Sequence, residues 1–256
     1  MSTPRVLITG ASSGIGEALA WEYARRGARL GLVARRAERL AALAHALPGG
    51  CATYEADVRD AHSMKRVAEH FIAQHGGADV VIANAGVSAG TLTQHDEDLA
   101  VFREIMDVNV LGMVHTFSPF LEAMRAARAG TLVGIASVAG IRGLPGAGAY
   151  SASKSAAVTY LESLRVECRG TGVSVVTIAP GYIATPMTAA NPYPMPFILP
   201  ADVAARRMLD AIARRRSYTI VPWQMGLVAL GLRALPRWLY DRLFARAPHK
   251  PRRASN

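Results

Sequence analysis

The sequence predicts an α/β fold in which a doubly wound, mostly parallel sheet of seven strands is flanked by helices. Two observations predict it. Short apolar runs alternate along the chain with segments of helical periodicity, and such runs are typical of strands buried on both faces of a parallel sheet. A glycine-rich turn also joins the first apolar run to the first helical segment.

Strands and helices are expected to alternate along most of the chain. The expected strands cover residues 5–9, 29–34, 51–56, 79–83, 130–136, 173–179 and 217–221. The expected helices cover residues 14–26, 37–47, 63–74, 97–128, 150–168 and 201–214. We therefore expect one domain over residues 1–222, with its ligand beyond the carboxyl ends of the strands. Residues 223–256 would add a basic, amphipathic helical extension.

The positive charge of the chain is concentrated near its C-terminus. The formal net charge is +10, and residues 201–256 carry +9 of it. The rest of the chain is nearly neutral, so we expect no nucleic-acid partner. The two cysteines, Cys51 and Cys168, lie far apart and match no metal-site spacing, and the first residues lack the apolar segment of a secretory signal. A reduced, cytoplasmic protein without a metal site is expected.

The glycine-rich turn has the spacing of a phosphate-binding loop. Gly10, Gly14 and Gly16 form a Gly-x-x-x-Gly-x-Gly pattern between the first strand and the first helix. Glycines let the backbone approach a pyrophosphate, and a helix N-terminus offers free N–H groups to it. A tight strand-to-helix turn without a ligand is the alternative.

Two arginines follow the second strand, where a dinucleotide-binding fold selects its cofactor. A carboxylate there binds the ribose 2′-hydroxyl of NAD, whereas an arginine accommodates the 2′-phosphate of NADP. This chain has Arg35 and Arg36 and no acid at that point. Cations at the start of a helix oppose its dipole, which suggests an anionic partner and favours NADP(H). A solvated arginine pair is the alternative.

A tyrosine and a lysine share one face of the helix expected at 150–168. Tyr150 and Lys154 are four residues apart, and a nearby ammonium should lower the pKa of the phenol towards that of a general acid/base. A surface pair is the ordinary alternative. Ser137 follows the strand expected at 130–136. Asn109 lies within an apolar helix, where a buried polar amide is expected to have hydrogen-bond partners.

Together these motifs resemble the short-chain dehydrogenase/reductase family over roughly residues 4–222, in its NADP(H)-preferring form. Seven motifs occur in the family's order and spacing: Thr9 to Gly16, Asp57-Val58, Asn84-Ala85-Gly86, Asn109, Ser137, Tyr150 with Lys154, and Pro180-Gly181-x-Ile183-x-Thr185. The resemblance implies hydride transfer between NADP(H) and the carbonyl or alcohol carbon of a small, fairly apolar substrate.

The resemblance also implies a role for each matched residue. Tyr150 would be the acid/base, Ser137 would hydrogen-bond the substrate oxygen, Lys154 would hold the nicotinamide ribose, and Asn109 would anchor a water of a proton relay. The remaining residues would contact the cofactor: Gly10, Ser12, Ser13, Gly14, Ile15 and Gly16 at the phosphates, Arg35 and Arg36 at the 2′-phosphate, Asp57 and Val58 at the adenine, Asn84 and Gly86 in the cleft, and Pro180, Gly181, Ile183 and Thr185 at the nicotinamide.

The chain departs from the family pattern near its C-terminus. Residues 186–200 carry five prolines among large apolar side chains, where the family has its substrate lid; a loop packed on its own domain is equally compatible. Many members end in a short strand tail that packs in a tetramer, whereas 34 residues follow Pro222 here. This puts the tetramer in doubt and leaves a homodimer on the helices near 112–128 and 150–168.

The extension has an apolar composition that should not stand free in water. Residues 223–235 contain one charge but are too few to span a bilayer. Residues 237–246 place apolar side chains on one helix face and arginines beside that face. Such a helix suits the inner face of an anionic membrane; packing on the enzyme or a partner subunit is the alternative. A cofactor-binding regulator or a membrane-tethered interaction protein with little turnover is the alternative function.

Overall fold

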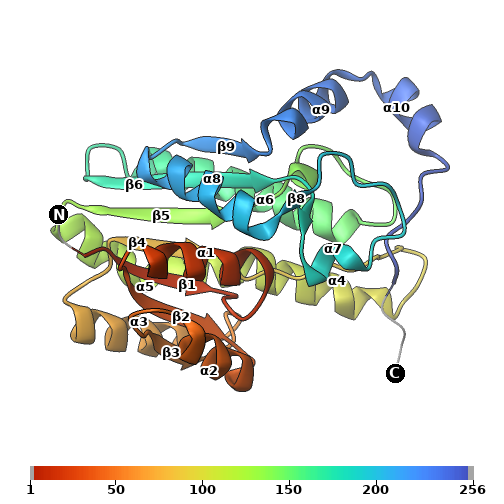
Figure 1. Ribbon diagram of the computed structural model, residues 1–256. Coiled ribbons are helices and arrows are strands. Elements are labelled where there is room, and N and C mark those ends of the chain that lie inside the picture. Colours follow the sequence, from red (N-terminus) through yellow and green to blue (C-terminus); the bar gives the residue numbers. More distant parts are fainter. Residues whose placement is uncertain (1–2, 253–256) are drawn as a thin grey trace.

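The seven main strands form one parallel sheet in the order β3-β2-β1-β4-β5-β6-β9 (Figure 1). The structure is a computed structural model and describes residues 3–252. The strands are β1 (Arg5–Thr9), β2 (Arg29–Ala34), β3 (Ala52–Glu55), β4 (Val80–Ala83), β5 (Gly130–Ile135), β6 (Val173–Pro180) and β9 (Tyr218–Val221). The predicted fold class is confirmed. The strand order reverses between β1 and β4, and a doubly wound sheet opens a ligand crevice at such a point.

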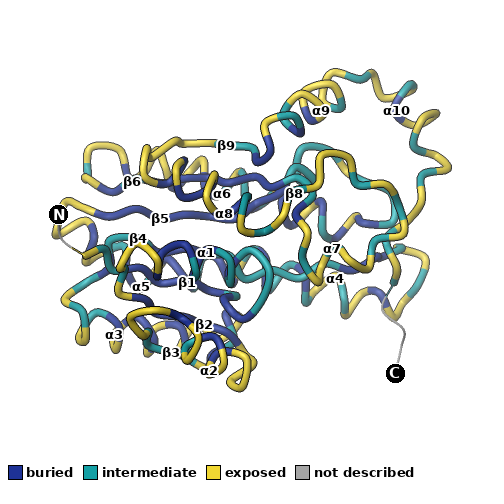
Figure 2. The backbone as a smooth tube through the Cα atoms, in the orientation of Figure 1, coloured by how far each residue is buried: buried dark blue, intermediate teal, exposed yellow. Residues whose placement is uncertain are grey.

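Helices cover both faces of this sheet, as Figures 1 and 2 show. The main ones are α1 (Gly14–Arg25), α2 (Ala37–Ala46), α3 (Ala61–His75), α4 (Asp98–Met106), α5 (Gly112–Ala126), α6 (Gly148–Glu167) and α8 (Ala201–Ala213). One face packs under α1, α2 and α8, and the other under α3, α5 and α6. Strands covered on both sides need apolar side chains in both directions, which explains the nearly continuous apolar runs.

The long helix expected at residues 97–128 forms, with one irregular turn inside it. A π-helical segment, η1 (Asp107–Leu111), separates α4 from α5. The backbone is helical without a gap from Asp98 to Ala126, so the expected helix is confirmed. Its π-helical turn was not predicted, because one extra residue in a turn barely disturbs the apolar periodicity. Such π-bulges occur mostly at functional sites, and η1 contains Asn109.

The polypeptide beyond β6 forms several short elements outside the main sheet. A short pair of parallel strands, β7 (Ile183–Ala184) and β8 (Leu199–Pro200), brackets α7 (Pro186–Ala189). After β9 the extension forms α9 (Trp223–Ala234) and α10 (Arg237–Phe244). Within residues 3–252, no helix is long and apolar enough to cross a membrane.

The extension is anchored to the loop that follows β5. The Arg142 guanidinium lies 3.9 Å from the ring centroid of Tyr240 in α10 and donates hydrogen bonds to the carbonyl oxygens of Leu232 and Leu235 at the end of α9. Tyr240 is buried and its hydroxyl donates to the Gly143 carbonyl. The chain then returns across the domain, where Gly90 N–H donates to the Pro251 carbonyl oxygen at 2.9 Å.

Candidate active site

The glycine loop joins β1 to α1 in a backbone conformation that requires glycine. Gly10 and Gly14 have φ values of +65° and +62°, and a Cβ on Gly10 would lie 2.7 Å from the Cα of Ala85. The Asn84 side chain donates to the carbonyl oxygens of Thr9 and Gly10 at 3.0 and 3.2 Å. Asn84 therefore holds the loop against the end of β4, while the Ala11 N–H of the loop donates to the Val33 carbonyl oxygen of β2 at 3.2 Å.

The N-terminus of α1 keeps its donors free. Ser13 occupies the N-cap position, but its side chain makes no capping hydrogen bond. Instead the Arg36 guanidinium, at the end of β2, donates to the hydroxyl oxygens of Ser12 and Ser13 at 2.9 and 3.0 Å. Two serine hydroxyls, the helix N-terminus and a guanidinium therefore converge where a phosphate would be stabilised.

Arg35 is directed differently from its neighbour. Its guanidinium lies 3.8 Å from the carboxylate of Asp57, which pairs more closely with Arg59 at 2.6 Å. Hydrogen bonds from Arg59, with smaller contributions from the charges of both arginines, hold the pKa of Asp57 below its usual value. Asp57 follows β3 and borders the crevice. A carboxylate is therefore present near β2, but it is already paired with Arg35 and Arg59.

Tyr150 lies at the start of α6, close to Ser137 beyond the end of β5. Burial raises the pKa of the Tyr150 phenol, and its hydrogen bond with Ser137 acts in the opposite direction. The Ser137 hydroxyl accepts from the N–H of Ala139 at 3.1 Å and makes only a long contact of 3.5 Å with the Pro180 carbonyl. Ser137 and Tyr150 are therefore neighbours on the wall of one cleft.

Lys154 lies one helical turn beyond Tyr150 and is buried. Its Nζ donates to the Ile135 carbonyl oxygen at 2.8 Å and lies 5.9 Å from the centroid of the Tyr150 ring. Burial lowers the pKa of Lys154 to about 8. The expected lowering of the Tyr150 pKa is not found in this state, because the loss of water around the phenolate outweighs the hydrogen bond with Ser137.

Asn109 lies behind these residues on η1 and is buried. Its Oδ1 accepts from the N–H of Val87 at 2.8 Å, and its Nδ2 donates to the Val87 carbonyl and to Ser153 Oγ at 3.0 and 2.9 Å. The Ser153 hydroxyl donates to the Tyr150 carbonyl at 2.8 Å. This explains the polar amide in an apolar segment: Asn109 joins the loop after β4 to the helix that carries Tyr150 and Lys154.

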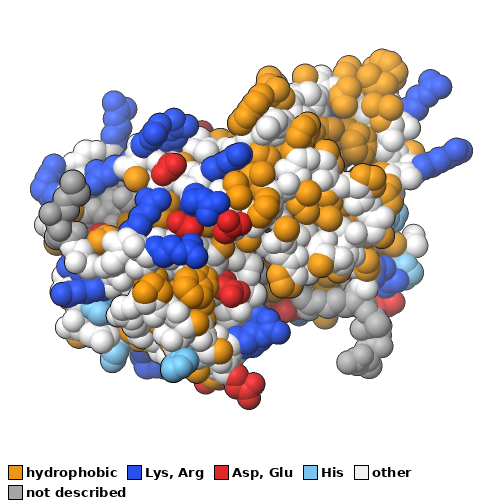
Figure 3. Space-filling model, in the orientation of Figure 1, with side chains coloured by type: hydrophobic (Ala, Val, Ile, Leu, Met, Phe, Trp, Pro, Cys, Tyr) orange, Lys and Arg blue, Asp and Glu red, His pale blue; other side chains and the backbone are white. Residues whose placement is uncertain are grey.

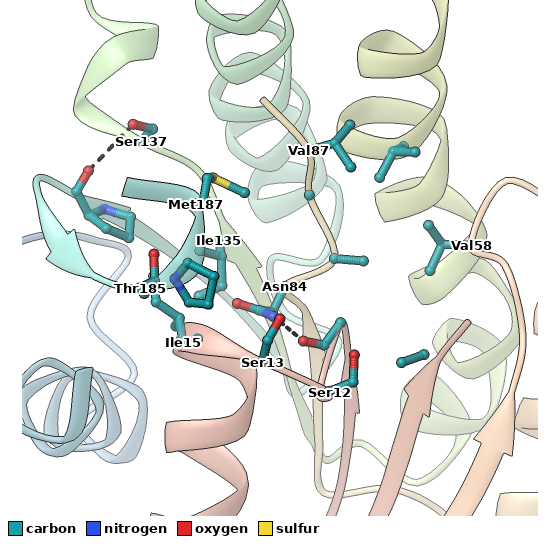
Figure 4. Close-up of a pocket in the computed structure, with 18 of the residues that line it drawn as sticks. Ser12, Ser13, Ile15, Val58, Asn84, Val87, Ile135, Ser137, Thr185 and Met187 are labelled. Carbon is teal, nitrogen blue, oxygen red and sulfur yellow. Dashed lines mark hydrogen bonds between the residues drawn. The ribbon is translucent and has the colours of Figure 1, made fainter. Parts of the chain in front are cut away.

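A cleft of about 430 Å³ runs along the carboxyl ends of the strands and brings most of the predicted residues together (Figure 4). Two predicted residues do not line it. Asn109 lies behind the loop after β4, and a Cβ on Gly16 would lie 2.4 Å from the Gly10 carbonyl oxygen, which places Gly16 beneath the glycine loop. The predicted residues on its wall are Gly10, Ser12, Ser13, Gly14, Ile15, Arg35, Arg36, Asp57, Val58, Asn84, Gly86, Ser137, Tyr150, Lys154, Pro180, Gly181, Ile183 and Thr185.

Comparison with known proteins identifies the family. The family described as short chain dehydrogenase matches residues 4–194. The chain belongs to this family. It is therefore an oxidoreductase acting on CH–OH and C=O groups with a nicotinamide cofactor.

Among curated relatives, an uncharacterized oxidoreductase of Myxococcus xanthus is 41% identical over 244 residues, which cover 94% of this chain and 96% of that protein. An 11-beta-hydroxysteroid dehydrogenase-like protein of Arabidopsis thaliana is 36% identical over 226 residues, which cover 85% and 73% of the two chains.

Two solved structures are similar over most of the chain. A short chain dehydrogenase/reductase of Burkholderia phymatum in complex with NAD has a TM-score of 0.82 at 25% identity and covers 99% of both chains. An alcohol dehydrogenase of Thermococcus sibiricus, complexed with 5-hydroxy-NADP, has a TM-score of 0.75 at 27% identity and covers 86% of this chain and 96% of that one.

The cleft fits the nicotinamide cofactor of a short-chain dehydrogenase. Its walls are apolar at Val33 and Val58 and polar at the glycine loop. A Cβ on Gly14 would lie 3.2 Å from Thr185, and one on Gly86 would lie 3.5 Å from Lys154 Nζ. Glycine at these two positions therefore keeps the space beside Thr185 and Lys154 clear.

Sequence reasoning missed the residues after α10. Lys250 Nζ donates to Ser88 Oγ at 2.9 Å and lies 5.9 Å from the centroid of the Tyr150 ring. No motif marks Lys250, since its position depends on the path of residues 245–252 back across the domain. The one feature of the sequence that pointed to this segment is that the basic residues after Pro222 match no part of the family pattern.

Proposed function

We propose that this short-chain dehydrogenase transfers a hydride between NADP(H) and the carbonyl or alcohol carbon of a small, fairly apolar substrate, with Tyr150 as the acid/base. One observation carries the proposal. Tyr150, Ser137 and Lys154 meet on the wall of the cleft whose other end is formed by the glycine loop and the arginines after β2. A proton donor and a phosphate site are thus joined by one continuous space.

When bound, the nicotinamide supplies the hydride in reduction or takes it in oxidation. The protein supplies the position and the proton. Tyr150 donates a proton to the substrate oxygen in reduction and accepts it in oxidation, while Ser137 hydrogen-bonds that oxygen. Lys154 has a pKa of about 8, which suits a group that exchanges protons near neutral pH. Asn109 would hold the water that connects Lys154 to solvent.

The preference for NADP is supported by the arginines at the end of β2. Arg36 already binds two hydroxyl groups of the glycine loop, and Arg35 stands beside it on the wall of the cleft. Asp57 is engaged by Arg59 and Arg35, so this carboxylate is a poor acceptor for a ribose hydroxyl. A guanidinium with free donors favours a phosphate.

An apolar substrate is supported by the segment between β7 and β8. It carries exposed Met187, Phe197 and Ile198, and the ring of Tyr193 within it lies 6.4 Å from the ring of Tyr182, just before β7. The similarity to an 11-beta-hydroxysteroid dehydrogenase-like protein points the same way. We therefore propose that the substrate is an alicyclic secondary alcohol or the corresponding ketone.

The test is NADPH oxidation by the purified enzyme over a panel of cyclic, linear and aromatic carbonyl compounds. We expect turnover of alicyclic ketones, with NADPH preferred to NADH. A cofactor-binding regulator would bind NADPH and reduce none of them, and that result would refute the enzymatic proposal.

A homodimer through α5 and α6, the helices near 112–128 and 150–168, is supported by exposed apolar side chains on or next to them. Leu111, just before α5, and Val166, near the end of α6, are exposed, and exposed apolar side chains are candidates for an association surface. We propose that two copies meet on these helices. Sedimentation velocity should give a dimer for the wild type and a monomer for Leu111→Glu with Val166→Glu; a wild-type monomer would refute it.

Peripheral contact with the inner face of a membrane, for an otherwise cytoplasmic enzyme, is supported by α9 and α10. Trp223 and Trp238 are 65% and 67% exposed, and Leu227, Leu230 and Leu243 are also exposed. Figure 3 shows an apolar surface over these helices, with arginine or lysine side chains at its outer edge. Met225, Ala229 and Tyr240 are buried, so each helix packs on the enzyme through one side and keeps an apolar side outward.

A further inference from the structure

Residues 247–252, here called the C-terminal strap, lie against the loop that follows β4. Gly90 forms a parallel bridge with Arg252, while its neighbour Thr91 forms one with Ala147, just before α6. Gly90 N–H donates to the Pro251 carbonyl oxygen, and Thr91 N–H donates to the Gly146 carbonyl oxygen. The strap is thereby linked through two backbone bridges to the residues that precede Tyr150.

An ion pair fixes the end of the strap. Arg252 donates to Asp98 Oδ2 and to Glu97 Oε1, both at 2.8 Å. Asp98 is buried and its carboxylate also accepts from the N–H of Leu92 at 2.8 Å. Removing the partner of a buried carboxylate strongly destabilises the folded state. The ion pair therefore fixes the position of the strap against α4.

Lys250 is the strap residue that approaches Tyr150, although it does not itself line the cleft. Its Nζ lies 5.9 Å from the Tyr150 ring centroid, the same distance as Lys154 Nζ. An ammonium has three donors, of which Ser88 Oγ takes one. In the part of the chain that the structure describes, no carboxylate lies within 4.0 Å of it. Burial lowers its pKa, as expected for a cation without a counter-charge.

We propose that the C-terminal strap closes the substrate side of the cleft and that Lys250 binds a carboxylate carried by the substrate. This rests on the proposed oxidoreductase function. A half-buried cation with spare donors is stabilised by an anion, and the ammonium lies beside the ring whose hydroxyl serves the reacting carbonyl. The substrate class becomes an alicyclic keto or hydroxy acid with an apolar ring and one anionic end.

The experiment compares 4-oxocyclohexanecarboxylate with 4-oxocyclohexanecarboxamide, which has the same shape but no charge. Wild-type kcat/KM should favour the carboxylate. Lys250→Met should lower that preference by about 10- to 100-fold, the range for a charged hydrogen bond, and Lys250→Arg should retain most of it. If the preference is unchanged in Lys250→Met, or both ketones lose activity equally, the proposal is overturned.

A second variant displaces the strap while leaving Lys250 in the chain. A Cβ on Gly90 would lie 2.1 Å from the Lys250 carbonyl oxygen, so Gly90→Ala should also remove the preference for the carboxylate. Gly231→Ala in α9 is the matched control, because a Cβ there meets nothing within 4 Å. Thermal melts check that both variants fold. A full preference in folded Gly90→Ala would contradict the proposal.

Binding separates this inference from the function on which it rests. Cyclohexanecarboxylate is titrated calorimetrically into the protein with NADP+ present, without turnover. Binding that Lys250→Met weakens supports the anion site even if neither ketone is reduced, a result that would count against the proposed function alone. No binding, or equal binding to wild type and Lys250→Met, overturns the anion site even if both ketones are reduced.

Discussion

The Arg36 guanidinium donates a hydrogen bond to Ser13 Oγ at 3.0 Å and so links the end of β2 to the glycine loop. It reaches Ser12 Oγ as well, whereas Arg35 is turned towards Asp57. Of the two arginines that the sequence singles out, Arg36 is the one placed over the helix N-terminus. The first prediction follows from this difference.

Arg36→Ala should raise KM for NADPH by about 10- to 100-fold, the value of one charged hydrogen bond or more. It should leave KM for NADH nearly unchanged, because NADH has no 2′-phosphate. Arg35→Ala should have a smaller effect, and Arg39→Ala, on the exposed side of α2, is the control. Steady-state kinetics with both cofactors measures this. A wild type that prefers NADH at equal concentrations would refute it.

Lys154 should reduce stability at neutral pH. Its pKa falls from 10.5 to about 8 on burial, so between these pH values the unfolded chain binds more protons and stability rises with pH. Lys154→Met should therefore be more stable than the wild type at pH 7. This advantage should be about 1.4 kcal/mol smaller at pH 9. That pH lies one unit above the folded-state pKa of about 8, and one unit corresponds to about 1.4 kcal/mol.

Urea denaturation of the cofactor-free protein at the two pH values measures the effect of Lys154→Met. Lys65→Met, on the exposed face of α3, is the matched control and should show no such pH dependence. An advantage of Lys154→Met that stays constant from pH 7 to pH 9 would show that Lys154 does not titrate in this range.

Asn109→Leu should destabilise the protein by about 1–3 kcal/mol, because it leaves the Val87 N–H without its partner. It should also lower kcat, since the loop after β4 and the helix of Tyr150 lose their connection through Ser153. Urea denaturation and kinetics are measured on the same preparation. Unchanged stability would show that water replaces the amide.

The outward side of α9 and α10 should bind anionic vesicles. We expect co-sedimentation with phosphatidylglycerol vesicles that weakens at high salt, because arginines contribute to it. Trp223→Ser with Trp238→Ser should abolish it, while Tyr218→Ser, an exposed aromatic on β9, should not. Absence of binding at low salt would leave these helices as packing elements or a subunit interface.

The strands, the helices of the main domain and the cofactor cleft could be predicted because local signals specify them. The glycine loop and the arginines after β2 are contiguous in sequence, and apolar runs identify strands. The π-helical turn at 107–111 could not be predicted, since a π-bulge leaves the apolar pattern nearly intact. The pKa of Tyr150 was predicted in the wrong direction, because burial depends on packing that spacing alone does not reveal.

Lys250 shows most clearly what the sequence alone could not predict. Its place beside Tyr150 depends on Arg142 holding α9 and α10, and on Arg252 reaching Asp98. These contacts join residues 93 and 154 positions apart, and neither arginine is part of a recognisable motif. The roles of Tyr150, Ser137, Lys154 and Asn109 remain predictions of the family resemblance that the geometry supports.

The central claim is that Tyr150 transfers the proton. Tyr150→Phe removes the hydroxyl and keeps the ring, so NADPH binding, followed by the fluorescence of the bound cofactor, should stay nearly intact. The kcat for an alicyclic ketone should fall by about 10²- to 10⁴-fold, the contribution of general acid/base catalysis. Turnover of Tyr150→Phe at the wild-type rate would contradict the account.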